Sequence, residues 1–175
     1  MAGSPNRLSP AEITDRLRAQ FGQDVVDAQD VHGHAVFGVT PARYAEIARF
    51  LRDEPDLAFD YFDFLGAVDY TPKGRGFEVA THLYSTRHGH HVRLKVECDP
   101  ADPHCPTLSG LWPGADWHER EANEMFGIVF DGHSHLVKLL LPEQFEGHPL
   151  RKDFALMTRE AKPWPGATEG EEIEE

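Results

Sequence analysis

The stretch from Asp116 to Asp153 is dense in side chains that could do acid-base chemistry. Glu121 and Glu124 lie three residues apart, and a glycoside hydrolase uses two carboxyl groups as its acid and base. Neighbouring turns of one helix face place these groups side by side rather than across a substrate. Arg120 would also lower their pKa, whereas a general acid needs a raised pKa. We expect no catalytic residue, and a stand-alone carboxylate hydrolase remains the alternative from another class.

The eleven histidines are the next residues that could do chemistry, as metal ligands. They form two clusters in the sequence, His133 with His135, and His88 with His90 and His91. A metal site needs three or four converging ligands, and neither cluster has a standard zinc or iron spacing. We therefore expect no metal site, and we expect the second cluster to be exposed turn residues.

Motifs that bind cofactors are missing from the sequence. It has no G-x-G-x-x-G, no Walker loop and no C-x-x-C, so no residues are available to cradle phosphate, a dinucleotide or a metal cluster. Cys98 and Cys105 are too few for a disulfide scaffold, and we expect two reduced thiols, buried or idle. The chain is expected to hold no cofactor.

Composition excludes several classes of partner. The net charge of -13 and the pI near 5.2 oppose binding to nucleic acid or to an anionic membrane surface. No apolar run reaches the roughly 18 residues of a membrane-spanning helix, and the N-terminus lacks the layout of a secretory signal. We expect a soluble, cytosolic chain.

A helix from about residue 116 to 127 must position the acidic side chains. Asp116 and Glu119 have the spacing of a capping box, and Gly127 is typical of a helix end. One polar face is predicted to carry Trp117, Arg120, Glu121 and Glu124. An Arg120–Glu124 ion pair on a solvated face is one interpretation of this face, and an ion-pair network facing a partner protein is the other.

A second polar segment follows this helix. Proline disfavours a helix at the residue before it, so Gly147 to Pro149 should be extended or turning. Leu150 then precedes Arg151 to Asp153, which is a basic spot in an acidic protein. This loop is either an ordinary surface loop or a projection that pairs with acidic groups of a partner.

The residues before this segment predict ordinary helices and strands that would support it. Ser9, Pro10 and Glu12 predict the start of a helix that ends at Gly22, and Thr40 with Pro41 predicts the start of a second helix that ends near residue 52. Residues 25–39 are rich in strand formers around a His32–His34 turn, and three strands with alternating apolar residues follow between 60 and 99.

These elements predict an α+β fold, a two-layer sandwich of a mostly antiparallel sheet with helices on one face. A short capped helix and an extended C-terminal motif segment should follow. We expect a disordered N-terminus over 1–8, the α+β domain over 9–105, and a docking segment over 106–154 that packs on the same domain. Residues 155–175 are predicted to be an extended acidic tail.

Several blocks of the sequence resemble the C subunit of NADH-quinone oxidoreductase, which is the 30-kilodalton-type subunit of respiratory complex I. The blocks are Glu119 to Ile128, Gly132-His133, Leu139 to Glu143 and Glu146 to Phe154. The resemblance is strong over 105–154, looser over about 9–99, and absent from the acidic tail. Its motif residues in this chain are Glu119, Arg120, Glu121, Glu124, Gly127, Gly132, His133, Gly147, His148, Pro149, Arg151, Lys152 and Asp153.

The resemblance implies an accessory subunit without redox activity of its own. It would belong to the peripheral arm of a proton-translocating complex, on the cytoplasmic side of the cell membrane, and would contact the membrane only through that complex. Its partners would be the large quinone-site subunit and neighbouring peripheral-arm subunits. FMN, iron-sulfur clusters and quinone would be bound by other subunits, and the motif residues would form the interface or hold its shape.

The chain departs from the family pattern at two places. Glu124 stands where the family usually has Asp, and Ser134 to Val137 replace a Pro-Asp-Leu-Arg segment, with Lys138 as the nearest cation. The resemblance leaves one alternative within the family, which is the equivalent subunit of a membrane-bound hydrogenase or of a ferredoxin- or F420-dependent complex.

Overall fold

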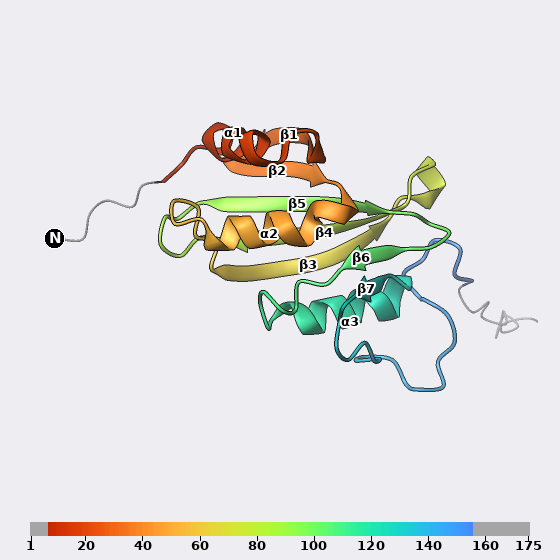
Figure 1. Ribbon diagram of the computed structural model, residues 1–175. Coiled ribbons are helices and arrows are strands. Elements are labelled where there is room, and N and C mark those ends of the chain that lie inside the picture. Colours follow the sequence, from red (N-terminus) through yellow and green to blue (C-terminus); the bar gives the residue numbers. More distant parts are fainter. Residues whose placement is uncertain (1–6, 156–175) are drawn as a thin grey trace, which may run out of the picture.

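A five-stranded sheet forms the centre of the computed structural model, which describes residues 7–155 (Figure 1). Its strands are β1 (Val25–Val31), β2 (His34–Val39), β3 (Tyr61–Asp69), β4 (Phe77–Tyr84) and β5 (His91–Cys98). They lie in the order β1-β2-β5-β4-β3. β2 runs parallel to β5, and the other neighbours are antiparallel. The predicted mostly antiparallel sheet is confirmed, and the parallel pair joins the first hairpin to the later three strands.

Two helices, α1 (Pro10–Phe21) and α2 (Tyr44–Asp53), cover one face of this sheet (Figure 1). They bury the apolar stripes that the sequence predicts, Ile13, Leu17 and Phe21 on α1 and Tyr44, Ile47, Ala48 and Leu51 on α2. Across the interface, the Tyr44 hydroxyl lies 2.5 Å from the hydroxyl of Thr81 on β4. The predicted two-layer α+β sandwich is confirmed.

The first helix begins and ends as the sequence predicts. The Ser9 hydroxyl accepts a hydrogen bond from the Glu12 amide, and the Glu12 carboxylate accepts one from the Ser9 amide at 2.8 Å. Gly22, with φ of 55°, ends the helix. The predicted cap of the second helix is wrong, because the Thr40 hydroxyl donates to Asp24 at 2.8 Å instead.

The remaining elements are a third helix, two short strands and three 3-10 turns. A helix, α3 (Ala115–Phe126), packs along β3 (Figure 1). The strands β6 (His104–Pro106) and β7 (Val129–Asp131), which the sequence did not predict, form a short parallel pair. Single 3-10 turns occupy Gly22–Asp24, Pro41–Arg43 and Thr71–Lys73. A shared core of buried residues includes Ala122, Phe126, Ile128 and Phe130, so residues 106–131 pack on the same domain.

Two predictions about single side chains have different outcomes. Cys98 and Cys105 are both buried and free, as predicted. His90 was expected in an exposed turn, but it is only 2% exposed and its Nε2 lies 2.7 Å from the carbonyl oxygen of Leu57. That expectation was wrong because the turn folds back over the loop after α2.

The ends of the chain are described only in part. Leu8 packs into the core, so ordered structure begins before the predicted boundary at residue 9. The predictions for residues 1–6 and for nearly all of the acidic tail lie outside the described residues. Within 7–155, no helix is long and apolar enough to span a bilayer.

Candidate functional site

Glu124 is buried at the end of α3 and holds the next part of the chain. Its carboxylate accepts hydrogen bonds from the amides of Leu139, Leu140 and Leu141, at 3.1, 2.9 and 2.5 Å. Burial alone would raise the pKa of Glu124, but these amides and the charge of Lys138 lower it below its ordinary value. Glu124 is therefore an ionised structural anchor.

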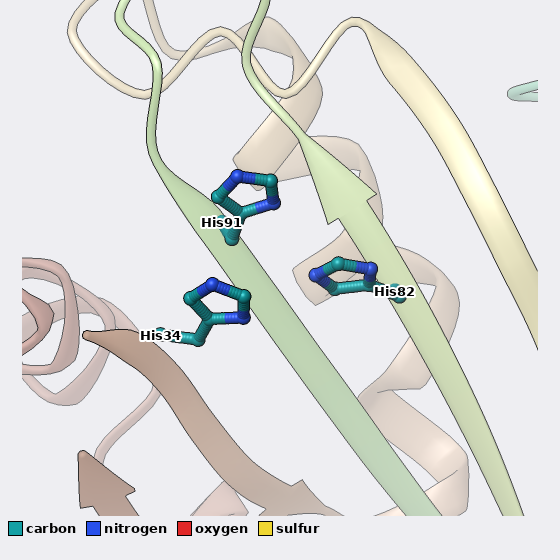
Figure 2. Close-up of side chains that lie close together, drawn as sticks. All are labelled: His34, His82 and His91. Carbon is teal, nitrogen blue, oxygen red and sulfur yellow. The ribbon is translucent and has the colours of Figure 1, made fainter. Parts of the chain in front are cut away.

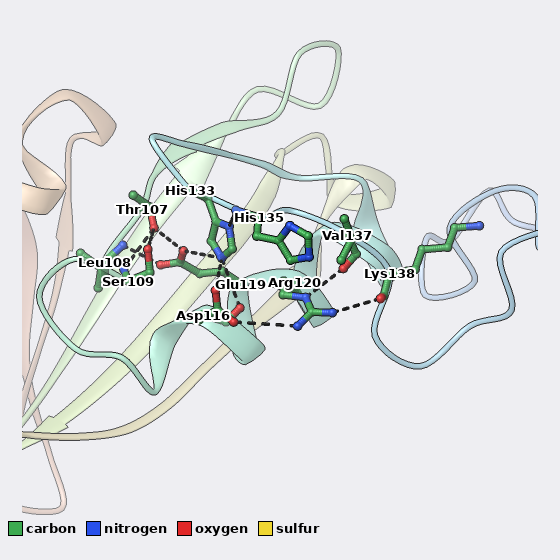
Figure 3. A network of polar contacts seen from close by, with 10 residues as sticks. All are labelled: Thr107, Leu108, Ser109, Asp116, Glu119, Arg120, His133, His135, Val137 and Lys138. Carbon is green, nitrogen blue, oxygen red and sulfur yellow. Dashed lines mark hydrogen bonds and ion pairs between the residues drawn. The ribbon is translucent and has the colours of Figure 1, made fainter.

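Arg120 does not pair with Glu124 within the described part of the chain. Its Nε and Nη2 donate to the carbonyl oxygens of Val137 and Lys138, at 3.0 and 3.1 Å (Figure 3). The guanidinium also lies 3.9 Å from the Asp116 carboxylate. The interpretation of an Arg120–Glu124 ion pair was wrong, because both side chains turn toward the segment after β7.

Glu119, in the N-terminal half of α3, is buried among polar groups of other segments. The Thr107 hydroxyl and the Leu108 amide donate to its carboxylate, at 2.5 and 2.6 Å (Figure 3). Burial raises the pKa of Glu119 above its ordinary value, and these donors offset that only in part. The predicted capping box with Asp116 is therefore wrong: α3 begins after Gly114 without a side-chain cap.

His133, in the segment after β7, packs against the carboxylates of Asp116 and Glu119. Its side chain is fully buried, and its Nε2 lies 3.1 Å from the Asp116 carboxylate and 3.9 Å from that of Glu119. Gly132, just before it, has φ of 85°, which favours glycine. Asp116, Glu119 and His133 thus form one intramolecular cluster (Figure 3).

The last turn of α3 receives three hydrogen bonds from residues 147–153, which we call the basic loop. His148 Nδ1 lies 2.9 Å from the carbonyl oxygen of Glu124, the Leu150 amide donates to Met125 at 3.1 Å, and Arg151 Nε donates to Phe126 at 2.5 Å. These carbonyl groups have no partner inside the helix. The loop therefore caps the helix.

Further contacts hold residues 132–154 together and attach them to β3. The Lys138 ammonium donates to carbonyl oxygens of Glu143 and Phe145, at 3.1 and 2.5 Å. The Lys152 amide donates to the carboxylate of Asp69, a buried residue at the end of β3, at 2.8 Å. Asp69, Thr107 and Lys138 thus belong to the same framework, although the sequence did not single them out as site residues.

The remaining motif residues lie at the surface or at turns. Glu121, Gly147, Lys152 and Asp153 are exposed, and Pro149 is half-buried. Gly147 has φ of 84°, and Gly127, which ends α3 as predicted, has φ of 75°. The structure brings together one subset of the predicted residues as an internal framework, namely Glu119, Arg120, Glu124, His133, His148 and Arg151.

Several large hydrophobic side chains are exposed on and near this framework. Of the large hydrophobic side chains exposed within residues 7–155, Trp117, Val129, Val137, Leu140 and Leu150 lie on α3 or after it, and Tyr61, Phe64 and Val68 lie on the neighbouring β3. A groove of about 200 Å³ runs between α3 and β3 and is lined by Phe64, His118, Met125 and Leu150, among others. Exposed apolar side chains beside a groove are typical of a protein-binding surface.

Comparison with known sequences gives consistent matches to one family. Residues 37–160 match the profile of a family described as "Respiratory-chain NADH dehydrogenase, 30 Kd subunit". The chain is 44% identical over 153 residues to the C subunit of NADH-quinone oxidoreductase from Roseiflexus sp. (strain RS-1), covering 87% of this chain and 88% of that protein. Its identity to the C 2 subunit of the same enzyme from Rhizobium meliloti (strain 1021) is 41% over 161 residues, covering 92% and 87%.

Two solved structures resemble the fold. The trypsin-resistant fragment of Nqo5 superposes with a TM-score of 0.60 and 26% identity, over 72% of this chain and 98% of the fragment. A chain of the membrane-bound sulfane sulfur reductase, an archaeal respiratory membrane complex, superposes with a TM-score of 0.71, over 84% of this chain and 86% of that one. Its identity of 22% supports a shared fold alone.

Proposed function

The chain belongs to the family of 30-kilodalton subunits of respiratory-chain NADH dehydrogenase, and from this premise we propose that it is the docking C subunit of an NADH:quinone oxidoreductase. Its work is to bind and position other subunits of the peripheral arm, chiefly the large quinone-site subunit. Electrons pass from NADH through FMN and iron-sulfur clusters to quinone on those subunits. The isolated chain has no activity of its own.

One observation carries the docking role: Arg120, Glu124 and Arg151 of the motif bind groups inside the chain, while several large apolar side chains on the same elements stay exposed. Arg120, Glu124 and Arg151 bind backbone groups of neighbouring segments. Trp117 and Leu150 are 65% and 51% exposed. Large apolar side chains on a rigid support are the usual anchors of a protein interface, because burying them in a partner removes apolar area from water.

The buried state of Glu124 argues against the alternative of a carboxylate hydrolase. Three backbone amides occupy its carboxylate, and its pKa is lowered, which is the opposite of what a general acid requires. Glu121 is exposed and lines the groove between α3 and β3. The two carboxyl groups therefore do not face one substrate.

The location follows from this assembly. We place the chain on the cytoplasmic side of the cell membrane as a peripheral part of a membrane complex, in contact with the bilayer only through its partners. The electron donor is set by other subunits. NADH-driven quinone reduction by the purified complex therefore separates this assignment from the related hydrogenase and ferredoxin- or F420-dependent complexes.

Native purification of the full chain from membranes that contain the complex tests the proposal. The chain should elute with the other peripheral-arm subunits and with NADH:quinone oxidoreductase activity. Combining Trp117→Ala with Leu150→Ala should lower its recovery in the complex roughly tenfold or more, because a buried interface anchor contributes about 2 kcal/mol.

Val31→Ala is the matched control, since it removes an exposed apolar side chain from β1, far from α3. Its recovery in the complex should equal that of the unchanged chain. Elution of the unchanged chain as a lone monomer would overturn the proposed function, and equal recovery of the control and the double variant would overturn the docking surface.

A further inference from the structure

Three histidines from adjacent strands come together on the sheet face opposite α1 and α2 (Figure 2). His34 is on β2, His91 on β5 and His82 on β4. The strand register pairs Ala35 with Val92 and His82 with Arg93, so His34 lies beside His91 and His82 lies diagonally across from it. The sequence did not group them because 57 residues separate His34 from His91 (91 − 34 = 57).

The three imidazole rings lie close together and are stacked, with interplanar angles of 14 to 15°. Each offers a ring nitrogen, and the three nitrogens lie within 4.8 Å of one another. The ring centroid of His34 lies 4.4 Å from that of His91, and the ring centroid of His82 lies 5.2 Å from it. His82 Nε2 and His91 Nδ1 are buried and have no hydrogen-bond partner among the described residues. Buried nitrogens without a partner are costly unless some group satisfies them.

A carboxylate orients one of the three rings. Asp63 on β3 lies 2.7 Å from Nδ1 of His82. A proton on this nitrogen leaves the lone pair on Nε2, which is the tautomer that a metal ligand needs. A carboxylate that holds the far nitrogen of a histidine is the common supporting contact of zinc-binding histidines.

Burial favours the neutral form of two of these rings. It lowers the pKa of His34 and of His91 below the ordinary value, and the neighbouring imidazoles lower it further, with smaller contributions from Arg93 for His34 and from Arg7 for both. Both rings are therefore neutral at pH 7 and can donate a lone pair. The same arginines oppose a bound cation, and Asp63 is the carboxylate that offsets them.

We propose that His34, His82 and His91 form a binding site for a divalent transition-metal ion, with zinc as the best fit. Three imidazole nitrogens are the protein ligands of an open zinc site, in which a water or another group takes the fourth position. Tetrahedral ligands on zinc stand roughly 3.4 Å apart, so binding requires the stacked rings to rotate about their side-chain bonds until one nitrogen of each points at the ion. None of the three histidines lines the groove between α3 and β3, so the metal site does not rest on the docking role.

Isothermal titration of the untagged 175-residue chain with zinc chloride at pH 7 tests the site. One equivalent should bind, and cobalt substitution should give the visible absorption bands of a tetrahedral site. His34→Ala, His82→Ala and His91→Ala should each remove this binding. Asp63→Asn should weaken it about 10 to 100-fold, as expected for a supporting carboxylate.

His32→Asn is the matched control. It removes an exposed histidine from the neighbouring turn, where φ is 55°, and asparagine tolerates that conformation. Binding should be unchanged in this variant, and circular dichroism should show that all variants are folded. Absence of zinc binding by the unchanged chain, or binding that survives all three alanine substitutions, would overturn the site.

Discussion

The guanidinium of Arg151 lies over the ring of Phe77, 5.0 Å from its centroid, and joins the basic loop to the first residue of β4. The same side chain donates through Nε to the carbonyl oxygen of Phe126. A residue that looked like a free cation is therefore a link between the sheet, the end of α3 and the C-terminal segment.

Replacing Arg151 with alanine should destabilise the chain itself. The variant loses a charged hydrogen bond to a helix carbonyl and a cation–π contact, together worth about 2 to 3 kcal/mol. Urea unfolding measures this loss. Lys152→Ala is the control and should change stability by less than about 0.5 kcal/mol, because Lys152 uses its backbone amide to bind Asp69. Equal losses in both variants would contradict the role of Arg151.

Glu124→Gln should loosen the segment that carries Leu139 to Leu141. The amide side chain keeps one acceptor oxygen but loses the charge that three amides share, at a cost of about 2 kcal/mol. Limited proteolysis should give new cleavage near residues 138–142. Glu121→Gln changes an exposed carboxylate on the same helix and should leave both stability and cleavage unchanged. An unaltered cleavage pattern in Glu124→Gln would refute the anchor.

Glu119 should make stability fall as pH rises above its unfolded pKa, near 4.5. Burial raises its folded pKa, so the folded state binds more protons than the unfolded state between the two values. Glu119→Gln removes this titration. Measured by urea unfolding, its stability relative to the unchanged chain should be higher at pH 7 than at pH 4.5. A constant difference across this range would show that the folded pKa is not raised.

Gly127→Ala should disrupt the contact between α3 and the basic loop. A Cβ atom there would lie 2.6 Å from Arg151 Nη2 and 2.6 Å from His148 Nε2, at a φ of +75°. The expected loss is about 1 to 3 kcal/mol, from strain and displaced side chains. Gly110→Ala is the control, because its Cβ meets no heavy atom within 4 Å and its φ is not in the positive range. Thermal unfolding of the two variants distinguishes these outcomes.

Local signals in the sequence were sufficient for most of the scaffold. Ser9, Glu12 and Gly22 mark the ends of α1 with groups that bond within a few residues, and alternating apolar residues locate β4 and β5. Such signals depend on neighbours in the chain, so they can be read without the fold. The parallel pairing of β2 with β5 depends on long-range packing, and no local signal reports it.

The sequence identified residues of the candidate site, but it did not predict which groups their side chains contact. Spacing alone predicted that Asp116 and Glu119 would form a capping box at the start of α3. It also predicted an ion pair between Arg120 and Glu124. In the structure these four side chains meet groups 11 to 18 residues away in sequence, such as Leu108, His133 and Lys138. Helix periodicity shows which side chains share a face, but it does not show which segment returns to cover them. The histidine trio was missed for the same reason.

The parallel pairing of β2 with β5 also affects how the chain is made. The hairpin β1–β2 ends at Val39, and its sheet neighbour ends at Cys98. At roughly 5 to 20 residues per second, the ribosome adds β5 several seconds after it completes the hairpin. The backbone amide and carbonyl groups on one edge of β2 therefore have no partner strand during that interval, and a chaperone that binds nascent chains would meet this open edge before the sheet can close.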